Sequence, residues 1–133
     1  MTINSMSPEQ RTYYLLKKSM DASSYRSKVI SNNTSNFNTP GYKRHYVTFE
    51  DSLNNSMDNL SMKITKGQHI NDGISYGEIK EEVDRTSSMR TDGNNVDLDH
   101  EMVNKSSNAL MYSALITQAN NKLSTTKYVI NGR

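Results

Sequence analysis

Glycine is distributed unevenly along this chain of 133 residues, and its distribution limits where long helices can form. None of the six glycines lies in residues 1–40 or 94–131. Because glycine favours turns and weakens helices, these two stretches are where a helix can run without interruption. The sequence therefore predicts an N-terminal helical arm, an irregular middle segment and a C-terminal helical arm, at residues 1–41, 42–96 and 97–133.

Start and stop signals bound the N-terminal helix. Ser7 is a good N-cap, Pro8 suits the first helical position, and Gln10 lies where its side chain can complete a capping box. After a run rich in asparagine, Pro40 pushes the residue before it out of the helical region of backbone space. The sequence predicts a helix over residues 8–36.

The C-terminal helix has signals of its own. Asp97 is a suitable N-cap, and Asp99 and Glu101 place negative charge in the first turn, where the helix dipole favours it. The Asn-Gly pair that ends at Gly132 is typical of a helix C-terminus. The sequence predicts a helix over residues 97–130.

Apolar and small residues recur at intervals of seven on each arm. The first row is Leu15, Leu16, Ala22, Val29 and Ile30, and the second row is Met102, Ala109, Ile116, Leu123 and Ile130. Rows this narrow are typical of coiled-coil contacts and cannot anchor a globular core. The predicted fold is therefore mainly α, with the two long helices pairing as a coiled-coil-like hairpin. The rows either hold this hairpin together or contact other subunits, and the pattern leaves both possibilities open.

The middle segment has weaker signals. Residues 48–51 can open a short helix with apolar residues on one side, namely Phe49, Leu53, Met57 and Leu60. Residues 62–65 and 79–83 are weak strand candidates, separated by glycine-containing turns. We expect a small, irregular and partly β segment.

Composition narrows the function further. Hydrophobic residues make up 33% of the chain, whereas an average globular chain is roughly 45–50% apolar. The chain has no cysteine, which excludes disulfides, thiolate metal sites and thiol catalysis. Its net charge of +2 is too small to indicate binding to nucleic acid, and no apolar run approaches the ~18 residues of a membrane-spanning helix. We expect neither a nucleic-acid partner nor membrane insertion.

Patterns that would indicate catalysis or a cofactor are missing. The three histidines, His45, His69 and His100, share no ligand spacing with one another. The acidic run from Asp92 fails the calcium-loop pattern, because Val96 stands where an acidic or amide ligand is needed. No glycine-rich phosphate loop or nucleophile elbow occurs. We therefore predict a protein that is not an enzyme and needs no metal or cofactor. The basic, aromatic residues 42–46 favour a solvated loop over a nucleic-acid contact.

The end of the first helix carries a more specific pattern. Residues 31–44 resemble the N-terminal signature of bacterial flagellar rod and hook proteins, which runs Ala-Asn-Asn-Ile-Ala-Asn, two variable positions and Thr-Pro-Gly-Tyr, often with Lys-Arg after it. The matching positions are Asn32, Asn33, Asn36, Thr39, Pro40, Gly41, Tyr42, Lys43 and Arg44. Hydroxyl side chains at Ser31, Thr34 and Ser35 replace apolar or small residues of the pattern, which weakens the packing face there.

A second resemblance is narrower. Residues 90–102 resemble the segment that opens the C-terminal helix in the proximal rod type of this family, the FlgB type, and residues 47–51 resemble the same type. The short chain agrees, because hook and distal rod proteins usually carry a larger middle domain. The Asp-Gly-Asn-Asn-Val-Asp-Leu-Asp run argues against the second proximal rod type.

The resemblance implies a structural subunit of the flagellar rod, required for flagellum-dependent motility, that assembles helically into the shaft carrying torque to the hook. It implies contacts with other copies, with other rod proteins, and with rotor-ring and adaptor proteins at the rod base. It also implies passage through the flagellar type III export apparatus to the basal body, outside the cytoplasmic membrane. Residues 1–10 agree with that route, since they lack the basic start and apolar stretch of a secretory signal peptide.

Residue roles follow from the patterns and the resemblance together. The two rows of apolar residues are predicted subunit interfaces, and Asn32, Asn33 and Asn36 are predicted to cap the helix or to bond between subunits. The predicted turn motif consists of Thr39, Pro40, Gly41 and Tyr42. A cytoplasmic helical adaptor or export chaperone is the alternative, and such a protein would stay folded inside the cell. We also expect frayed arms in the isolated subunit, because rows without partners do not offset chain entropy.

Overall fold

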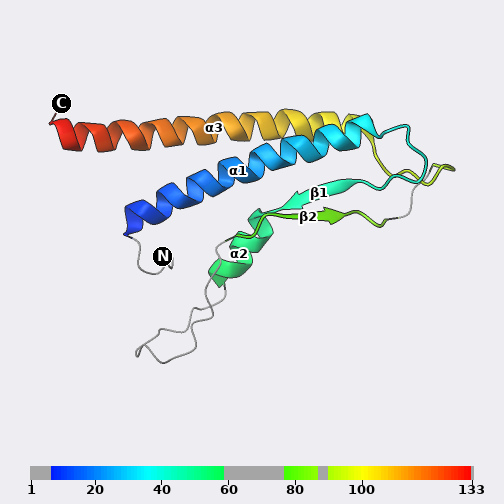
Figure 1. Ribbon diagram of the computed structural model, residues 1–133, viewed down its shortest axis with the longest axis horizontal. Helices are drawn as coiled ribbons and strands as arrows, with labels where there is room; N and C mark the ends of the chain where they lie inside the picture. Colours follow the sequence, from blue (N-terminus) through cyan, green and yellow to red (C-terminus); the bar gives the residue numbers. More distant parts are fainter. Residues whose placement is uncertain (1–6, 59–76, 87–89, 133) are drawn as a thin grey trace, which may run out of the picture.

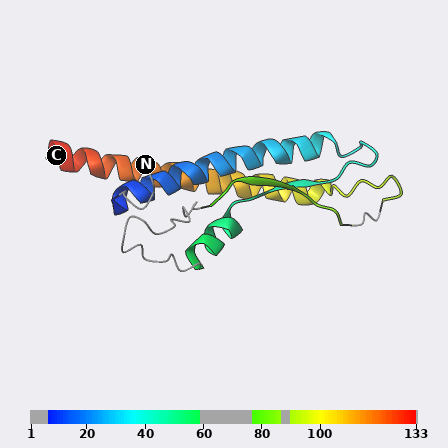
Figure 2. The same ribbon diagram turned by 60° about the horizontal axis from the view of Figure 1, so that its bottom comes forward.

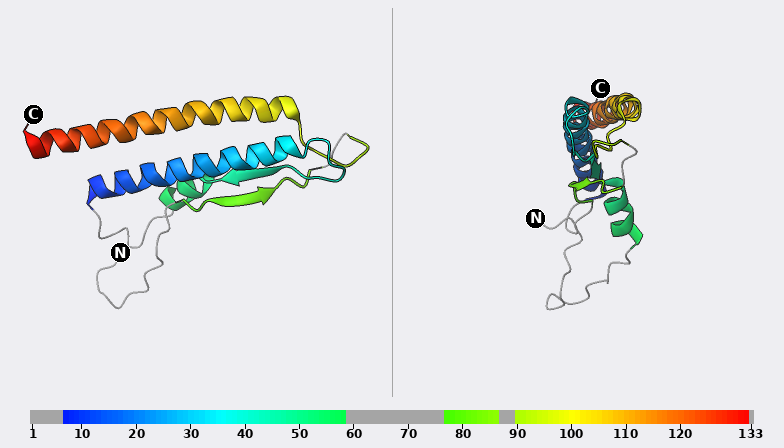
Figure 3. Two further views of the ribbon diagram at one scale, coloured as in Figure 1. Left: turned by 45° about the horizontal axis from the view of Figure 1, so that its top comes forward. Right: turned by 90° about the vertical axis from the view of Figure 1, so that its right-hand side faces the viewer.

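The computed structural model describes residues 7–58, 77–86 and 90–132. Two long antiparallel helices lie side by side, and a two-stranded sheet lies beside the N-terminal one (Figure 1). The short helix lies on the same side as the sheet, farther from the helix pair (Figure 1). The end-on view in Figure 3 shows the same layers. The elements are α1 (Pro8–Ser35), β1 (His45–Thr48), α2 (Glu50–Asp58), β2 (Lys80–Val83) and α3 (Leu98–Asn131). The predicted mainly α hairpin with a small, partly β middle is confirmed.

Local chemistry sets the ends of α1 as the sequence predicts. The Ser7 side chain accepts a hydrogen bond from the backbone N–H of Gln10, and the Gln10 side chain accepts one from the backbone N–H of Ser7. Pro8 occupies the first turn, where a missing N–H costs nothing. At the other end, the Asn36 backbone N–H still bonds to Asn32, but its ψ of 13° leaves the helix.

The ends of α3 are also those predicted. The Asp97 carboxylate accepts hydrogen bonds from the backbone N–H groups of Asp99 and His100, at 3.0 and 3.3 Å. Gly132 adopts the left-handed conformation, φ 66°, and its N–H donates to the Tyr128 carbonyl. With 34 residues against 28, α3 is about 9 Å longer than α1 and extends past the start of α1 (Figure 2).

The middle segment forms a short antiparallel pair. His45 of β1 lies opposite Val83 of β2, and Thr48 lies opposite Lys80. Strand β2 falls within the predicted strand at residues 79–83, and α2 matches the predicted short helix. The predicted strand at 62–65, together with Leu60 and His69, lies outside the described residues.

Strand β1 corrects one expectation. The sequence favours a loop over residues 42–46, but His45 and Tyr46 begin β1. A strand of four residues is too short for a clear alternating pattern. It forms here because β2 supplies backbone partners and because Val47 is buried.

The apolar core of the described residues is small and lies between the helix pair and the sheet. Its buried members are Ala22, Val29, Ile30, Val47, Phe49 and Val96. Phe49 is covered by Gly77, whose backbone leaves no room for a side chain. The contact between α1 and α3 is polar by comparison. Asn108 donates to the Ser23 carbonyl and accepts from the Ser23 hydroxyl, both at 2.9 Å.

No helix in the described ranges combines the length and the apolar character that crossing a membrane requires.

Candidate functional site

The two sequence segments that carry the family resemblance meet at one end of the helical hairpin. We call residues 32–44 and 90–101 the motif clasp. The Gly41 backbone N–H donates to the Asp92 carbonyl at 2.8 Å, and the Lys43 ammonium donates to the Gly93 carbonyl at 2.8 Å. Gly41 has φ 72°, a conformation that other residues rarely adopt. The clasp therefore joins the end of α1 to the approach to α3.

Asn94 is the central side chain of the motif clasp. Its Nδ2 lies within hydrogen-bond distance of three carbonyls of the turn after α1, those of Asn36, Phe37 and Thr39, at 2.9–3.0 Å. Its Oδ1 accepts from the Val96 backbone N–H at 2.8 Å. Asn94 is fully buried, so these bonds replace water for turn carbonyls that have no helical partner.

Arg90 closes the outer side of the clasp. Its guanidinium lies 4.8 Å from the centre of the Phe37 ring and donates to the Phe37 carbonyl at 3.2 Å. It also pairs with the Asp92 carboxylate at 2.8 Å. The pKa of Asp92 is lowered chiefly by the hydrogen bond from the Asn94 backbone N–H, and the Arg90 contact adds to this.

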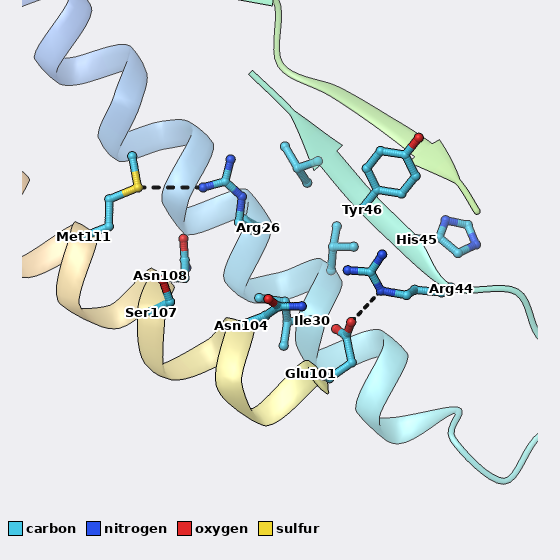
Figure 4. Close-up of a pocket in the computed structure, with 12 residues that line it drawn as sticks. Arg26, Ile30, Arg44, His45, Tyr46, Glu101, Asn104, Ser107, Asn108 and Met111 are labelled. Atoms are coloured by element: carbon cyan, nitrogen blue, oxygen red, sulfur yellow. Dashed lines mark hydrogen bonds and ion pairs between the residues drawn. The ribbon is translucent and has the colours of Figure 1, made fainter. Parts of the chain in front are cut away.

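A buried ion pair lies deeper in the clasp, where α3 begins. Glu101 is fully buried, and its Oε1 accepts from Arg44 Nε at 2.7 Å (Figure 4). Its Oε2 accepts from Asn33 Nδ2 at 3.1 Å. Both carboxylate oxygens therefore have donors, which a buried charge needs to be tolerated.

Asn33 connects this ion pair to the sheet. Its amide donates to the His45 carbonyl at 2.7 Å and accepts from the His45 N–H at 3.0 Å, so it pairs with His45 as a neighbouring strand would. The Tyr42 hydroxyl also donates to Asn33 Oδ1, at 3.3 Å. The pKa of Tyr42 is raised by burial first, and then by the charges of Glu81 and Glu101.

The predicted asparagine and turn residues are thus distributed around the clasp. Asn33 lies inside it, whereas Asn32 is exposed and its carbonyl accepts from Asn36. Thr39 supplies a carbonyl to Asn94, while Pro40 is exposed. In the single chain these residues serve the turn itself.

The first predicted row divides between two environments. Ala22, Val29 and Ile30 are buried within the chain, and Leu15 and Leu16 are half-buried near the start of α1. The buried three therefore contribute to the chain's own core.

The second predicted row faces outward. Met102, Ile116, Leu123 and Ile130 are 49%, 39%, 52% and 76% exposed, and Ala109 is also exposed. The buried positions of α3 are Glu101 and Asn108, one residue earlier in the same seven-residue spacing. Leu115, at the next position of that spacing, is half-buried, so the row is polar only in the part of α3 near the clasp. The hairpin closes there on Glu101 and Asn108, and the apolar row stays on an accessible flank of α3.

Sequence reasoning missed the partners that hold the clasp. Glu101 was expected only to favour the helix dipole, and neither Arg44 nor Asn94 was expected to bond across the clasp. A signal was present, because Asn108 follows Glu101 by seven residues and extends a polar row beside the apolar one.

A pocket of about 270 Å³ lies between α1, β1 and α3 (Figure 4). Its charged groups are already paired, with Arg26 on Glu50 at 2.6 Å and Arg44 on Glu101. His45, at its edge, bonds to Glu81 at 2.6 Å. Within the described ranges no three histidine or acidic side chains gather as a metal ion would require. The charged groups around this pocket therefore hold α1, α2, the sheet and α3 together.

Comparison with known proteins gives a consistent result. The chain is 30% identical over 117 residues to the flagellar basal body rod protein FlgB of Bacillus subtilis, covering 88% of this chain and 91% of that protein. It is 36% identical over 108 residues to FlgB of Borrelia hermsii, covering 74% and 80%. It is 25% identical over 131 residues to FlgB of Proteus mirabilis, covering 91% and 94%. No protein-family model matches the chain. The extent of these alignments, together with the clasp that joins both motif segments, shows that the chain belongs to the FlgB family of flagellar basal body rod proteins.

Proposed function

We propose that this chain is a structural subunit of the proximal flagellar rod, assembled helically through α1 and α3 into the shaft that transmits torque. The relatives are named as basal body rod proteins, which supports this function. The motif clasp supports it too, because a tight closed end keeps two long helices aligned as one unit.

The observation that carries the proposal is the accessible apolar row of α3. An exposed apolar surface of this kind on a chain that is otherwise polar is typical of an interaction surface. Since the hairpin closes on Glu101 and Asn108, the row is free to contact neighbouring subunits. In the assembled rod it would be covered by helices of other copies or of other rod proteins.

The wider set of partners is part of the same proposal. The subunit would contact rotor-ring and adaptor proteins at the rod base, and it would reach the basal body through the flagellar type III export apparatus. The small apolar core supports such a route, because a chain of low stability unfolds readily for export.

Cell fractionation tests the function directly. A tagged copy is followed in strains with and without a working flagellar export apparatus. We expect the protein in purified basal bodies only when export works. Retention in the cytoplasm of both strains would contradict the proposal and favour the adaptor or chaperone alternative.

Substitutions in the rows test the interface. We expect Ile116→Asp and Leu16→Asp to block rod assembly and motility without lowering expression, because a charge in an apolar contact between helices is not compensated. Gln118→Asp, at an exposed polar position of α3, is the matched control and should assemble. Circular dichroism of each variant checks that helix content is retained. Normal motility of Ile116→Asp would contradict the assigned interface.

A further inference from the structure

The two ends of the hairpin differ in charge. Beyond Glu101, α3 contains three lysines and no acidic residue, and α1 has five basic residues against two acidic ones. The motif clasp contains four carboxylates against three basic residues. The α1 start and the α3 end lie together at the open end of the hairpin (Figure 1). The excess of basic residues in these helices therefore extends to the open end, whereas the clasp end is nearly balanced. The hairpin is therefore more basic at its open end than at its clasp end.

The open end also holds an apolar groove. It has a volume of about 520 Å³ and lies between the first turns of α1 and the last part of α3. Its apolar walls are Tyr13, Tyr14 and Leu123, and its rim carries Lys17 and Lys122 together with Glu9. Tyr13 is 46% exposed, so the groove is open to a partner.

The α3 segment beyond the groove enlarges this surface. Since α3 is longer than α1, its last residues have no part of α1 beside them (Figure 2). Tyr128, Val129 and Ile130 are exposed there, next to Lys127. The open end thus presents a wide apolar surface with basic residues around it.

The clasp end carries a surface of matching chemistry. Asp99, Met102 and Val103 are spaced three and four residues apart, which places them on one face of the first turns of α3. Asp99 is exposed, as are Met102 and Val103. This patch combines a carboxylate with apolar side chains, and the groove combines ammonium groups with apolar side chains.

We propose that the groove at the open end receives the Asp99–Met102–Val103 patch of a second copy. The contact rests on the proposed function, since it names one of the subunit contacts that a rod requires. It joins copies head to tail, because groove against groove brings lysines together and patch against patch brings carboxylates together. A head-to-tail contact uses two different surfaces, so it can repeat from copy to copy, and it produces an open row of subunits when the rotation between copies does not close into a ring.

Site-directed cross-linking tests the contact. Because the chain has no native cysteine, only the introduced thiols can form disulfides. Tyr13→Cys places a thiol in the groove and Val103→Cys places one in the patch, and all rim charges stay in place. When the two variants are mixed and oxidised, we expect the mixed disulfide dimer to exceed either homodimer by about tenfold, the ratio that ~1.4 kcal/mol of charge preference gives. Asn54→Cys, exposed on the acidic α2, is the control partner and should give no such excess.

Charge exchange provides the second measurement. The double change Lys17→Glu and Lys122→Glu should abolish the mixed dimer, and Asp99→Lys in the patch variant should restore it. Equal yields of mixed dimer and homodimers, or a yield that the charge reversals leave unchanged, would overturn the proposal.

The same cysteine variants separate this contact from the function itself. In cells that carry both variants, cross-linked dimers in purified basal bodies support the contact. Uncross-linked chains in basal bodies overturn the contact while the rod function stands. Absence of the unmodified chain from basal bodies overturns the function.

Discussion

Glu101 shows how a single residue fixes the geometry of the closed end. It is the first position of α3 that is fully buried, and its two oxygens receive Arg44 from the approach to β1 and Asn33 from α1. Three segments that are distant in sequence therefore meet on one carboxylate. A buried ion pair of this kind adds little net stability over apolar packing, but breaking it by removing one partner is costly.

Removing the Glu101 charge tests this role. Glu101→Gln keeps the side-chain volume and leaves the Arg44 guanidinium with only the longer contact to Asp84, at 3.9 Å, as a counter-charge. We expect the free energy of unfolding to fall by about 3 kcal/mol, the lower end of the cost of breaking a buried ion pair. Urea denaturation followed by circular dichroism measures the change. Asp99→Asn, in the same turn but exposed, should change it by less than about 1 kcal/mol. A change as small in Glu101→Gln would show that the ion pair does not hold the clasp.

A substitution at Gly77 tests how closely the backbone packs against Phe49, the aromatic residue of the core. A Cβ at this position would lie 2.5 Å from Phe49 Cε2, and the backbone has φ 60°. We therefore expect Gly77→Ala to destabilise the fold by about 3 kcal/mol, from the unfavourable φ and the clash together. Gly41→Ala is the comparison, because Gly41 has φ 72° with nothing within 4 Å. It should cost only about 1 kcal/mol. If thermal unfolding shows the same loss of stability in both variants, Phe49 moves aside to make room for the added methyl group.

At the scale of elements, a polar contact ties the sheet to α1. The Tyr25 hydroxyl of α1 donates to the Glu81 carboxylate of β2, which also bonds His45 of β1. The pKa of Glu81 is lowered chiefly by the Tyr25 hydrogen bond, with His45 contributing after that. The pKa of Tyr25 is raised because Glu81 holds its hydroxyl proton.

These pKa shifts predict how the strength of the contact between the sheet and α1 depends on pH. The lowered Glu81 pKa gives a contribution that is present above the ordinary carboxyl range and is lost as the pH falls through the folded value. The raised Tyr25 pKa gives a second contribution to stability. It is present below the ordinary phenol range and is lost as the pH rises through the pKa that Tyr25 has in the folded chain. We expect docking to be firmest between about pH 5 and pH 9.

Amide hydrogen exchange of β1 and β2 checks this prediction. Protection should be lower at about pH 3 than at neutral pH, after correction for the intrinsic exchange rate. Tyr25→Phe should reduce protection at neutral pH and flatten the acid limb, whereas Tyr13→Phe, far from the sheet, should leave the profile unchanged. A Tyr25→Phe profile identical to that of the unmodified chain would contradict the role of this contact.

For the whole molecule, the balance between a small core and two long helices governs stability. The helices span about 42 and 51 Å, and α3 keeps a full row of apolar side chains exposed. The isolated chain therefore orders much backbone for little apolar burial.

This balance predicts that helix content depends on assembly. In dilute solution we expect the far ends of α1 and α3 to fray, with a broad thermal transition, and we expect helix content to rise with protein concentration as the rows are covered. Circular dichroism over a wide concentration range measures this. Full helix content and a sharp transition in the dilute monomer would contradict it.

Sequence alone determined the features that depend on neighbouring residues. The N-caps at Ser7 and Asp97, the break at Pro40 and the stop at Gly132 act within one or two helical turns, so both long helices could be predicted nearly to the residue. The two motif segments were also visible in the sequence, because each is continuous.

Tertiary structure decided the rest, because it depends on residues that are far apart in the chain. Strand β1 exists only with β2 beside it, and the Asn94 and Glu101 networks exist only when the motif segments meet. Most important, the seven-residue spacing fits both the apolar row of α3 and Glu101 and Asn108, which lie one residue earlier. The spacing alone therefore does not show which of the two faces α1. The bonds of Asn108 to Ser23 and of Glu101 to Asn33 and Arg44 turn the polar row inward and leave the apolar row accessible.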